Sequence, residues 1–258
     1  MVSRTRPNIS ASSDAESKEK PDIKQANNEC KDALGFLRGL DLFSRLPEGE
    51  LTTLAATCFF ADIARGEYIT MEGEVEPAGF IVASGRLAMM KTSRSGKELV
   101  VELLAPCDIF GLIMALRQWP AELSARAQAK SQCLWVPRAS LIRVLHAHPE
   151  LYENLLSHIL EALHSSYRIA RGLAHDRVEV RIAAIILSLA LKFARPLKPG
   201  EKPIIDITRQ QLAELTGTSP ETAIRITRAL QHKGVLNIQR PGIIKVLKLD
   251  ALHELVDE

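Results

Sequence analysis

The sequence predicts an α+β protein with an antiparallel β-roll of the jelly-roll kind, a long helix and a C-terminal winged helix-turn-helix. Three observations predict it: glycine-separated apolar runs over residues 58–138, a heptad over residues 152–173, and a capped helix-turn-helix pattern over residues 207–230. Many short strands with turn residues between them are typical of an antiparallel roll. The expected segments are a flexible tail (1–28), the roll with a helical lead-in (29–148), the long helix (149–175) and the winged helix-turn-helix domain (176–258).

Composition and charge exclude several classes of protein. The chain has 258 residues, 46% of them hydrophobic, and 33 Lys and Arg against 31 Asp and Glu give a net charge of +2. This apolar fraction is enough to build cores, which excludes a fibrous or wholly disordered chain. The longest strongly apolar stretch, residues 182–194, contains Ser188 and Lys192 and is too short to cross a bilayer. Because the N-terminus also lacks an apolar segment, the sequence predicts a cytoplasmic protein with no membrane partner.

The N-terminal half changes in character along its length. Residues 1–28 contain no aromatic side chain and bury too little surface to offset the entropy of ordering, which predicts the flexible tail. Residues 29–57 carry apolar side chains at helical spacing and predict the helical lead-in. Residues 93–97 lie between two strand-like runs of the roll and are typical of a hairpin turn.

The cysteines and histidines do not form a recognisable chemical site. The four cysteines lie far apart without a C-x-x-C pair, whereas a disulfide framework would be denser and typical of a secreted chain. The sequence also lacks a Ser/His/Asp or Cys/His constellation, metal-ligand spacing and a phosphate-binding loop. We therefore expect free thiols, no metal site and no enzymatic activity. The cysteines are Cys30, Cys58, Cys107 and Cys133.

A heptad pattern distinguishes the long helix. From Tyr152 onwards, apolar or small residues recur at intervals of three and four, which is the seam of a two-stranded coiled coil. A helix that packed only on its own domain would need a wider apolar stripe. The pattern therefore favours self-association, with packing on the chain's own domain as the alternative. The expected dimer seam is Leu155, Ile159, Ala162, Ser166, Ile169 and Leu173.

Residues 207–230 carry the signals of two short helices joined by a tight turn. Thr208 with Gln211 three residues later is a capping box that begins the first helix. Gly217 ends that helix, because glycine tolerates left-handed dihedral angles. Ser219 and Pro220 suit the N-cap and first position of the second helix. Two helices separated by a short turn that contains glycine are the helix-turn-helix layout.

The second of these helices has two distinct faces. Ala223, Ile226 and Leu230 are spaced to anchor it to a core. The opposite face lies near the helix N-terminus, which in such motifs enters the DNA major groove. Arginine can bond a guanine edge with two hydrogen bonds, and glutamate can accept one from a cytosine amino group. The candidate base contacts are Glu221, Ile224, Arg225 and Arg228.

The residues around this helix suit contacts with DNA phosphates. Residues 235–238 and 243–246 predict two strands around a Pro-Gly turn, which is the wing of a winged helix-turn-helix. Seven basic residues against three acids give residues 206–248 a net charge of +4. Two of the candidates, Thr218 and Ser219, have helix capping as an alternative role. The candidate phosphate contacts are Arg209, Thr218, Ser219, Arg240 and Lys245.

This order of parts resembles the CRP/FNR superfamily of bacterial transcription regulators over about residues 34–250. The most specific stretch is ITRQQLAELTGTSPETAIRITRALQHKGVL, residues 207–236. The resemblance implies a homodimer that binds a two-fold promoter site, an effector in the roll that reorients the DNA-binding domains, and RNA polymerase as a partner. In the family, the residues that match Glu221 and Arg225 typically contact bases, while Ile224 stands where FNR-like members have serine. In the roll, supporting motifs are Ile69-x-x-Glu72-Gly73-Glu74, Ile81-Val82-x-Ser84-Gly85, Gly96-Lys97-Glu98 and Asp108-Ile109-Phe110-Gly111.

The roll departs from members of the family that bind cyclic AMP. Those members have Glu for the ribose and Arg for the phosphate where this chain has Leu112 and Leu123. A cyclic phosphate without its arginine would be a buried, unpaired anion, which argues against cyclic AMP. Because Cys30 is the only cysteine near the N-terminus, the sequence also argues against a [4Fe-4S] cluster. The expected effector pocket is Gly111, Leu112, Ile113, Leu123 and Ser124.

The identity of the effector stays open at this point. An apolar pocket suits haem or another apolar ligand, and a roll that binds nothing is a further possibility. The sequence also leaves open whether the protein is an activator or a repressor. The alternative function is a small-molecule or haem sensor whose helix-turn-helix contacts proteins in place of DNA.

Overall fold

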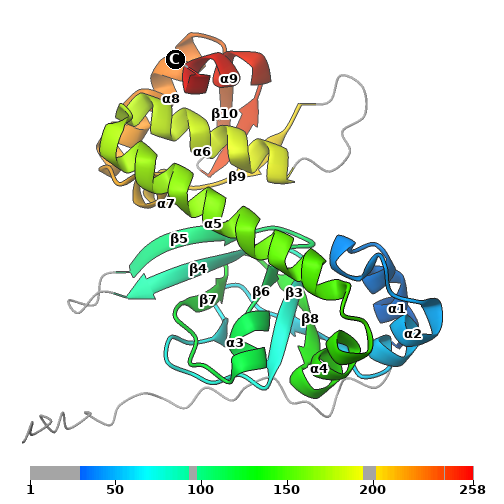
Figure 1. Cartoon of the computed structure of the whole chain (residues 1–258). Coiled ribbons are helices and arrows are strands. Elements are labelled where there is room, and N and C mark those ends of the chain that lie inside the picture. Colours follow the sequence, from blue (N-terminus) through cyan, green and yellow to red (C-terminus); the bar gives the residue numbers. More distant parts are fainter. Residues whose placement is uncertain (1–29, 93–97, 194–201, 241, 258) are drawn as a thin grey trace, which may run out of the picture.

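The computed structural model describes residues 30–92, 98–193, 202–240 and 242–257. A β-roll lies at one end of the molecule and a helix-rich C-terminal domain at the other, with the long helix α5 (Leu151–His175) running between them (Figure 1). The predicted fold class, with its antiparallel roll, long helix and winged helix-turn-helix, is confirmed. The predicted tail and the turn at 93–97 lie outside the described residues. Within the described ranges, no helix is long and apolar enough to cross a membrane.

The roll consists of two four-stranded antiparallel sheets, ordered β1-β8-β3-β6 and β2-β7-β4-β5. Its interior is packed with aromatic rings: Phe80 stacks on Phe110 at 5.0 Å between ring centroids and meets Trp135 edge-on at 4.8 Å. Such pairs add to the free energy gained from burial alone. The strands are β1 (Phe59–Ile63), β2 (Tyr68–Thr70), β3 (Ala78–Ser84), β4 (Leu87–Thr92), β5 (Glu98–Leu104), β6 (Ile109–Phe110), β7 (Ser124–Ala127) and β8 (Ser131–Pro137).

Short helices cover the outer face of the sheet that contains β3. Because side chains alternate along a strand, Phe80 and Val82 of β3 lie in the roll interior and Ile81 packs in a second cluster with the helices. The lead-in helices, predicted over residues 29–57, contribute to this second cluster. These elements are α1 (Cys30–Arg38), the 3₁₀ helix η2 (Asp41–Phe43), α2 (Glu48–Ala55), α3 (Leu112–Arg117) and α4 (Arg138–Ala147).

Gly79 on β3 is the point where α3 approaches this sheet most closely. A Cβ atom at Gly79 would lie 2.3 Å from Leu112 Cδ2 and 2.9 Å from Leu112 Cα, and a backbone atom cannot easily give way. We expect Gly79→Ala to lower the free energy of unfolding by about 1–3 kcal/mol, the usual effect of overpacking. Urea unfolding of purified protein measures this.

Gly49 in α2 provides the matched control, because a Cβ atom there would have no neighbour within 4 Å. We expect Gly49→Ala to raise the free energy of unfolding by about 0.5–1 kcal/mol, since alanine favours the helix. A Gly79→Ala protein as stable as the unchanged chain would contradict the close packing of α3 on β3.

The first turns of α5 belong to the core of the chain itself. Leu151 and Leu155 are buried in the cluster with the lead-in helices. The Asn154 Nδ2 group donates hydrogen bonds to the carbonyl oxygens of Asp41 at 3.0 Å and Leu42 at 3.1 Å. These contacts fix the direction in which α5 leaves the roll. Leu155 therefore fills the chain's own core, in contrast to its expected place in a dimer seam.

The C-terminal domain combines helices with a small antiparallel sheet of order β10-β11-β9. Its last helix, α9, was not anticipated from the sequence; it packs on α6, and Leu252 is fully buried between them. The elements are α6 (Val178–Phe193), β9 (Ile204–Asp206), α7 (Arg209–Thr216), α8 (Pro220–His232), β10 (Leu236–Arg240), β11 (Ile243–Val246) and α9 (Leu249–Asp257).

The roll and the C-terminal domain share one apolar cluster. Buried side chains of β4 and β5 pack in the same cluster as those of α6, α7 and α8. Lys192 Nζ at the end of α6 also lies 2.7 Å from Asp108 Oδ2. Because ion pairs near the surface contribute only about 0–1 kcal/mol, the apolar contacts hold the two domains together. The roll contributes Ala88, Met90, Val100 and Leu103 to this cluster.

Candidate nucleic-acid interface

Local hydrogen bonds set the geometry of the turn between α7 and α8. The capping box is confirmed: the Gln211 backbone N–H donates to Thr208 Oγ1 at 3.1 Å, and the Thr208 N–H donates to Gln211 Oε1 at 3.0 Å. Gly217 ends α7 with φ 60° and ψ 44°, the left-handed conformation expected of a glycine there. The start and the end of α7 are therefore determined by residues close in the sequence, as predicted.

Ser219 begins α8, as the sequence predicted. Its Oγ accepts a hydrogen bond from the Thr222 N–H at 3.2 Å, and Pro220 follows at the first helical position. Ser219 thus has the capping role, which is the alternative to a phosphate contact. Contacts of Ser219 and Thr218 with phosphate stay predictions.

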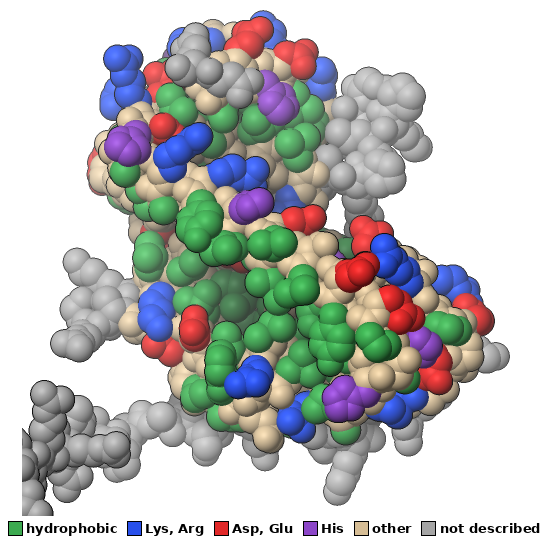
Figure 2. All heavy atoms as spheres, viewed as in Figure 1, with side chains coloured by type: hydrophobic (Ala, Val, Ile, Leu, Met, Phe, Trp, Pro, Cys, Tyr) green, Lys and Arg blue, Asp and Glu red, His purple; other side chains and the backbone are tan. Residues whose placement is uncertain are grey.

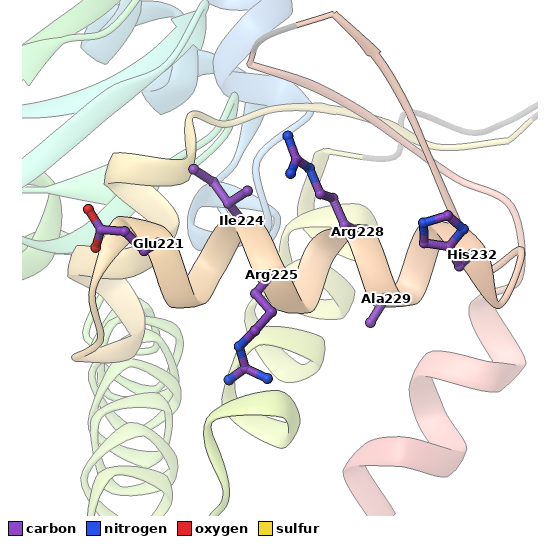
Figure 3. A pocket seen from close by; sticks show the side chains of 6 residues that line it. All are labelled: Glu221, Ile224, Arg225, Arg228, Ala229 and His232. Atoms are coloured by element: carbon purple, nitrogen blue, oxygen red, sulfur yellow. The ribbon is translucent and has the colours of Figure 1, made fainter.

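The two faces of α8 differ as expected. Ala223, Ile226 and Leu230 are buried and hold the helix on the domain core. On the other face, Glu221, Arg225 and Arg228 are exposed and Ile224 is half-buried (Figure 3). The helix therefore presents charged side chains to solvent on the face that we assigned to DNA.

Two hollows lie along this outer face of α8. Figure 3 shows the side chains of the first, which run from Glu221 in the first turn of the helix to His232 in its last. The second lies between α8 and the wing. Ile224 and Arg228 line both hollows. The first hollow is lined by Glu221, Ile224, Arg225, Arg228, Ala229 and His232, and the second by Arg209, Ile224, Thr227, Arg228, Gln231, Ile238, Gln239 and Arg240.

Six of these lining residues are not among the candidates from the sequence: Thr227, Ala229, Gln231, His232, Ile238 and Gln239. Helical spacing contained the signal for two of them. Ala229 and His232 follow Glu221 by eight and eleven residues, and such intervals lie on one helix face. Gln239 reaches the second hollow from β10, so its position depends on how the wing packs and not on local spacing.

The arginines of this surface are available to bind an anion. Within the described residues, the structure shows no ion pair for the four arginines of the two hollows. Lys245 lies on β11, opposite Asn237 of β10. Unpaired guanidinium groups on a convex helix and an adjacent wing suit the evenly spaced phosphates of a duplex. The four arginines are Arg209, Arg225, Arg228 and Arg240.

Glu221 is the one acid in the first hollow, and it is held in its ionised form. A hydrogen bond from its own backbone N–H and a second from the Ser219 hydroxyl lower the pKa of Glu221 below its usual range. An ionised carboxylate at the N-terminus of a helix is also favoured by the helix dipole. Glu221 is therefore a hydrogen-bond acceptor at neutral pH, as recognition of a cytosine amino group requires.

On the side that does not pack on the chain's own core, α5 presents an apolar stripe to solvent. Figure 2 shows hydrophobic side chains gathered along this helix and over the adjoining face of the roll. The stripe includes Ile159 and Leu173 of the expected seam, and Ala162 and Ser166 are exposed beside it. The side chain of Ile169 lies outside the described residues. The large apolar residues of the stripe are Tyr152, Leu156, Ile159, Leu160, Leu163, Tyr167 and Leu173.

The residues of the expected effector pocket do not all face the roll interior. Leu112 packs against the outer face of β3, in the cluster with the helices. Ile113 packs against the same cluster. Gly111 adopts φ 71°, and a Cβ atom there would lie 3.0 Å from the Phe80 ring. Buried Ser124 accepts a hydrogen bond from the Glu72 N–H at 2.9 Å, and Leu123 beside it is half-buried.

Cys133 is a buried free thiol. Burial raises the pKa of its thiol to about 12, so in the metal-free chain it is protonated and a weak nucleophile at neutral pH. In the part of the chain that the structure describes, no three His, Cys, Asp or Glu side chains are grouped so that they could hold a metal ion.

Comparison with known proteins assigns the chain to a family. Residues 61–148 match the cyclic nucleotide-binding domain, and residues 180–255 match the Crp-like helix-turn-helix domain. The chain belongs to the CRP/FNR family. This is a family of transcription regulators and not of enzymes.

Alignments of this chain with three proteins cover nearly the whole length of each of them. The chain is 28% identical to the cyclic AMP receptor protein of Thermus thermophilus over 220 residues, which are 85% of this chain and 98% of that protein. A CRP/FNR family transcriptional regulator of the same organism, TTHA1359, has a solved structure with TM-score 0.62 and 25% identity, covering 77% of this chain and 98% of that one. FixK2 from Bradyrhizobium japonicum shares the fold with TM-score 0.68 at 20% identity, covering 77% and 97%.

At two positions the roll of this CRP/FNR member differs from what the resemblance implies for a cyclic nucleotide site. Leu112 and Leu123 replace the polar residues that the resemblance implies, and Leu112 lies outside the roll interior. The arginines nearest in sequence are engaged elsewhere: Arg126 pairs with Glu98 at 3.1 Å, and the guanidinium of Arg117 stacks over an exposed tryptophan ring. Neither of these two leucine positions therefore supplies a cationic partner for a buried phosphate anion.

Proposed function

We propose that the protein is a homodimeric, sequence-specific DNA-binding regulator of transcription. It binds a pseudo-palindromic promoter site, with α8 in the major groove and the wing on the phosphate backbone. The observation that carries this proposal is the outer face of α8, where Arg225 and Arg228 are exposed without acidic partners among the described residues. Regulation of transcription implies a cytoplasmic location and RNA polymerase as a partner.

The apolar stripe on α5 supports the homodimer. Leu156 and Leu160 are 56% and 52% exposed, and Tyr167 is 63% exposed, on one helix of a single chain. Contiguous apolar patches of this kind mark association surfaces. A second copy of α5 covers the stripe when two helices pack along a common axis, and a two-fold pair then presents two copies of α8 to a two-fold site.

The effector that we propose is not a cyclic nucleotide. The name of the Thermus relative refers to cyclic AMP, but this roll lacks the charged anchors for a cyclic phosphate. The aromatic interior, with Phe80, Phe110 and Trp135, favours an apolar molecule if the roll binds one. Haem, whose porphyrin ring is apolar, is another candidate, and an absorbance spectrum of the purified protein tests for it through the Soret band.

Selection of DNA from a random-sequence library tests the main proposal. We expect the full chain to enrich one pseudo-palindromic sequence. Its affinity for that site should fall steeply with salt, because Arg209, Arg240 and Lys245 of two protomers neutralise about six phosphates and give a slope of roughly −5 in log K against log [salt]. If no DNA sequence is enriched while the roll binds a small molecule, the alternative of a helix-turn-helix that contacts proteins is favoured.

A further inference from the structure

We infer that Ile224 recognises the 5-methyl group of a thymine in each DNA half-site. This inference rests on the proposed DNA-binding function and goes further, because it names a base and the atom group that is read. The starting observation is an aliphatic side chain in the middle of an otherwise polar surface. Ile224 lines both hollows of the outer face of α8, with Glu221 one turn before it and Arg228 one turn after it.

The protein core does not require an isoleucine at this position. Ala223, Ile226 and Leu230 fill the inner face of α8 and are buried to 5% exposure or less. Ile224 is only half-buried and faces the hollows (Figure 3). A four-carbon side chain that is left partly in water gains little from folding, so its apolar surface is available for a ligand.

The chemistry of the major groove leaves one partner for such a side chain. Every base edge there presents hydrogen-bond donors or acceptors, and the single apolar group is the C5-methyl of thymine. An isoleucine placed against a polar edge would displace water from donors and acceptors without replacing their hydrogen bonds, which opposes binding. Against a methyl group the same side chain buries apolar surface on both sides.

The shape of isoleucine suits this contact. A β-branched side chain on a helix is restricted to essentially one χ1 rotamer, so little side-chain entropy is lost when it meets the base. The neighbouring side chains indicate what surrounds the thymine. Arg225 and Arg228 suit guanine, and ionised Glu221 suits the amino group of cytosine. We therefore expect a half-site in which a thymine lies beside G·C pairs.

Replacing thymidine with deoxyuridine tests the inference, because their bases, thymine and uracil, differ only by the 5-methyl group. Each thymine of the selected site is replaced in turn, in both half-sites together. At one symmetric position we expect the dissociation constant to rise about fourfold per methyl group, or about fifteenfold for the pair. In the reverse test, a cytosine placed there and methylated to 5-methylcytosine should bind more tightly than unmethylated cytosine.

Protein variants attribute the methyl effect to Ile224. Ile224→Ala keeps a strong helix former and should bind thymine and deoxyuridine sites equally, with an unchanged salt slope. Ile224→Val should keep part of the discrimination, and it provides a second variant if Ile224→Ala does not fold. Deoxyuridine also alters the shape of the duplex. An effect of duplex shape would be the same for the unchanged chain and for Ile224→Ala, whereas an effect of direct contact would be lost in Ile224→Ala.

The outcomes separate this inference from the proposed function. If the chain enriches a site but binds thymine and deoxyuridine equally at every position, the inference is overturned and DNA binding stands. Retention of the full preference for thymine by Ile224→Ala would also overturn it, because another group would then read the methyl. If no DNA is enriched at all, the proposed function itself fails.

Discussion

Replacing Arg225 with alanine is expected to lower affinity for the selected DNA site by roughly ten- to a hundredfold, the contribution of a bidentate contact with guanine. Affinity for scrambled DNA should hardly change, because the remaining arginines and Lys245 still neutralise phosphates. The reason lies in the position of Arg225, which is exposed on the outer face of α8 in the first hollow. Competition gel shifts with selected and scrambled duplexes measure both affinities.

Arg240 at the end of β10 provides the matched control, because it carries the same charge on the wing and not on α8. Arg240→Ala should weaken binding to both duplexes by the same factor and reduce the magnitude of the salt slope by about one per protomer. If Arg225→Ala instead behaves like Arg240→Ala, Arg225 contacts phosphate and the assignment of α8 as the reading helix is wrong.

The second large effect is expected at the apolar stripe of α5. Leu160→Glu places a charge at the centre of the stripe, where a second copy of the helix would bury it, and burial of an unpaired charge costs several kcal/mol. We expect the variant to sediment as a monomer. Its affinity for the selected site should also fall sharply, because one protomer can then occupy only one half-site at a time.

Leu191 on α6 is the control for this variant, because it is 55% exposed, similar to Leu160, but lies outside the stripe. Leu191→Glu should leave both the sedimentation coefficient and DNA affinity unchanged. A Leu160→Glu chain that stays dimeric and binds its site normally would show that another surface joins the protomers.

The helix-turn-helix could be predicted from the sequence because its determinants are local. The side chains of Thr208 and Gln211 bond backbone groups three residues away, and Ser219 does the same for Thr222. Gly217 needs only its own freedom to adopt a positive φ. Such short-range signals are independent of the rest of the fold, so the caps and the faces of α8 follow directly from residue spacing.

Packing between distant segments could not be predicted in the same way. The heptad places Leu155 with Ile159, but contact with the lead-in helices buries Leu155 in the chain's own core. The position of Leu112 also depends on a distant residue. Its side chain occupies space next to β3 that is open only because residue 79 is a glycine without a Cβ atom. The apolar cluster that joins β4 and β5 to α6 also combines residues about a hundred positions apart, and no local period reveals it.

Hydroxyl-radical footprinting of the full chain on its selected site tests the central proposal most directly, because it locates the protein on both DNA strands. Two copies of α8 on a two-fold dimer should protect two segments whose centres lie about one helical turn, or 34 Å, or a multiple of it apart. Protection should shrink to one segment with Leu160→Glu at concentrations where that variant still binds. A single uninterrupted footprint without two-fold symmetry, or equal protection along any sequence, would contradict a dimer that reads DNA with α8.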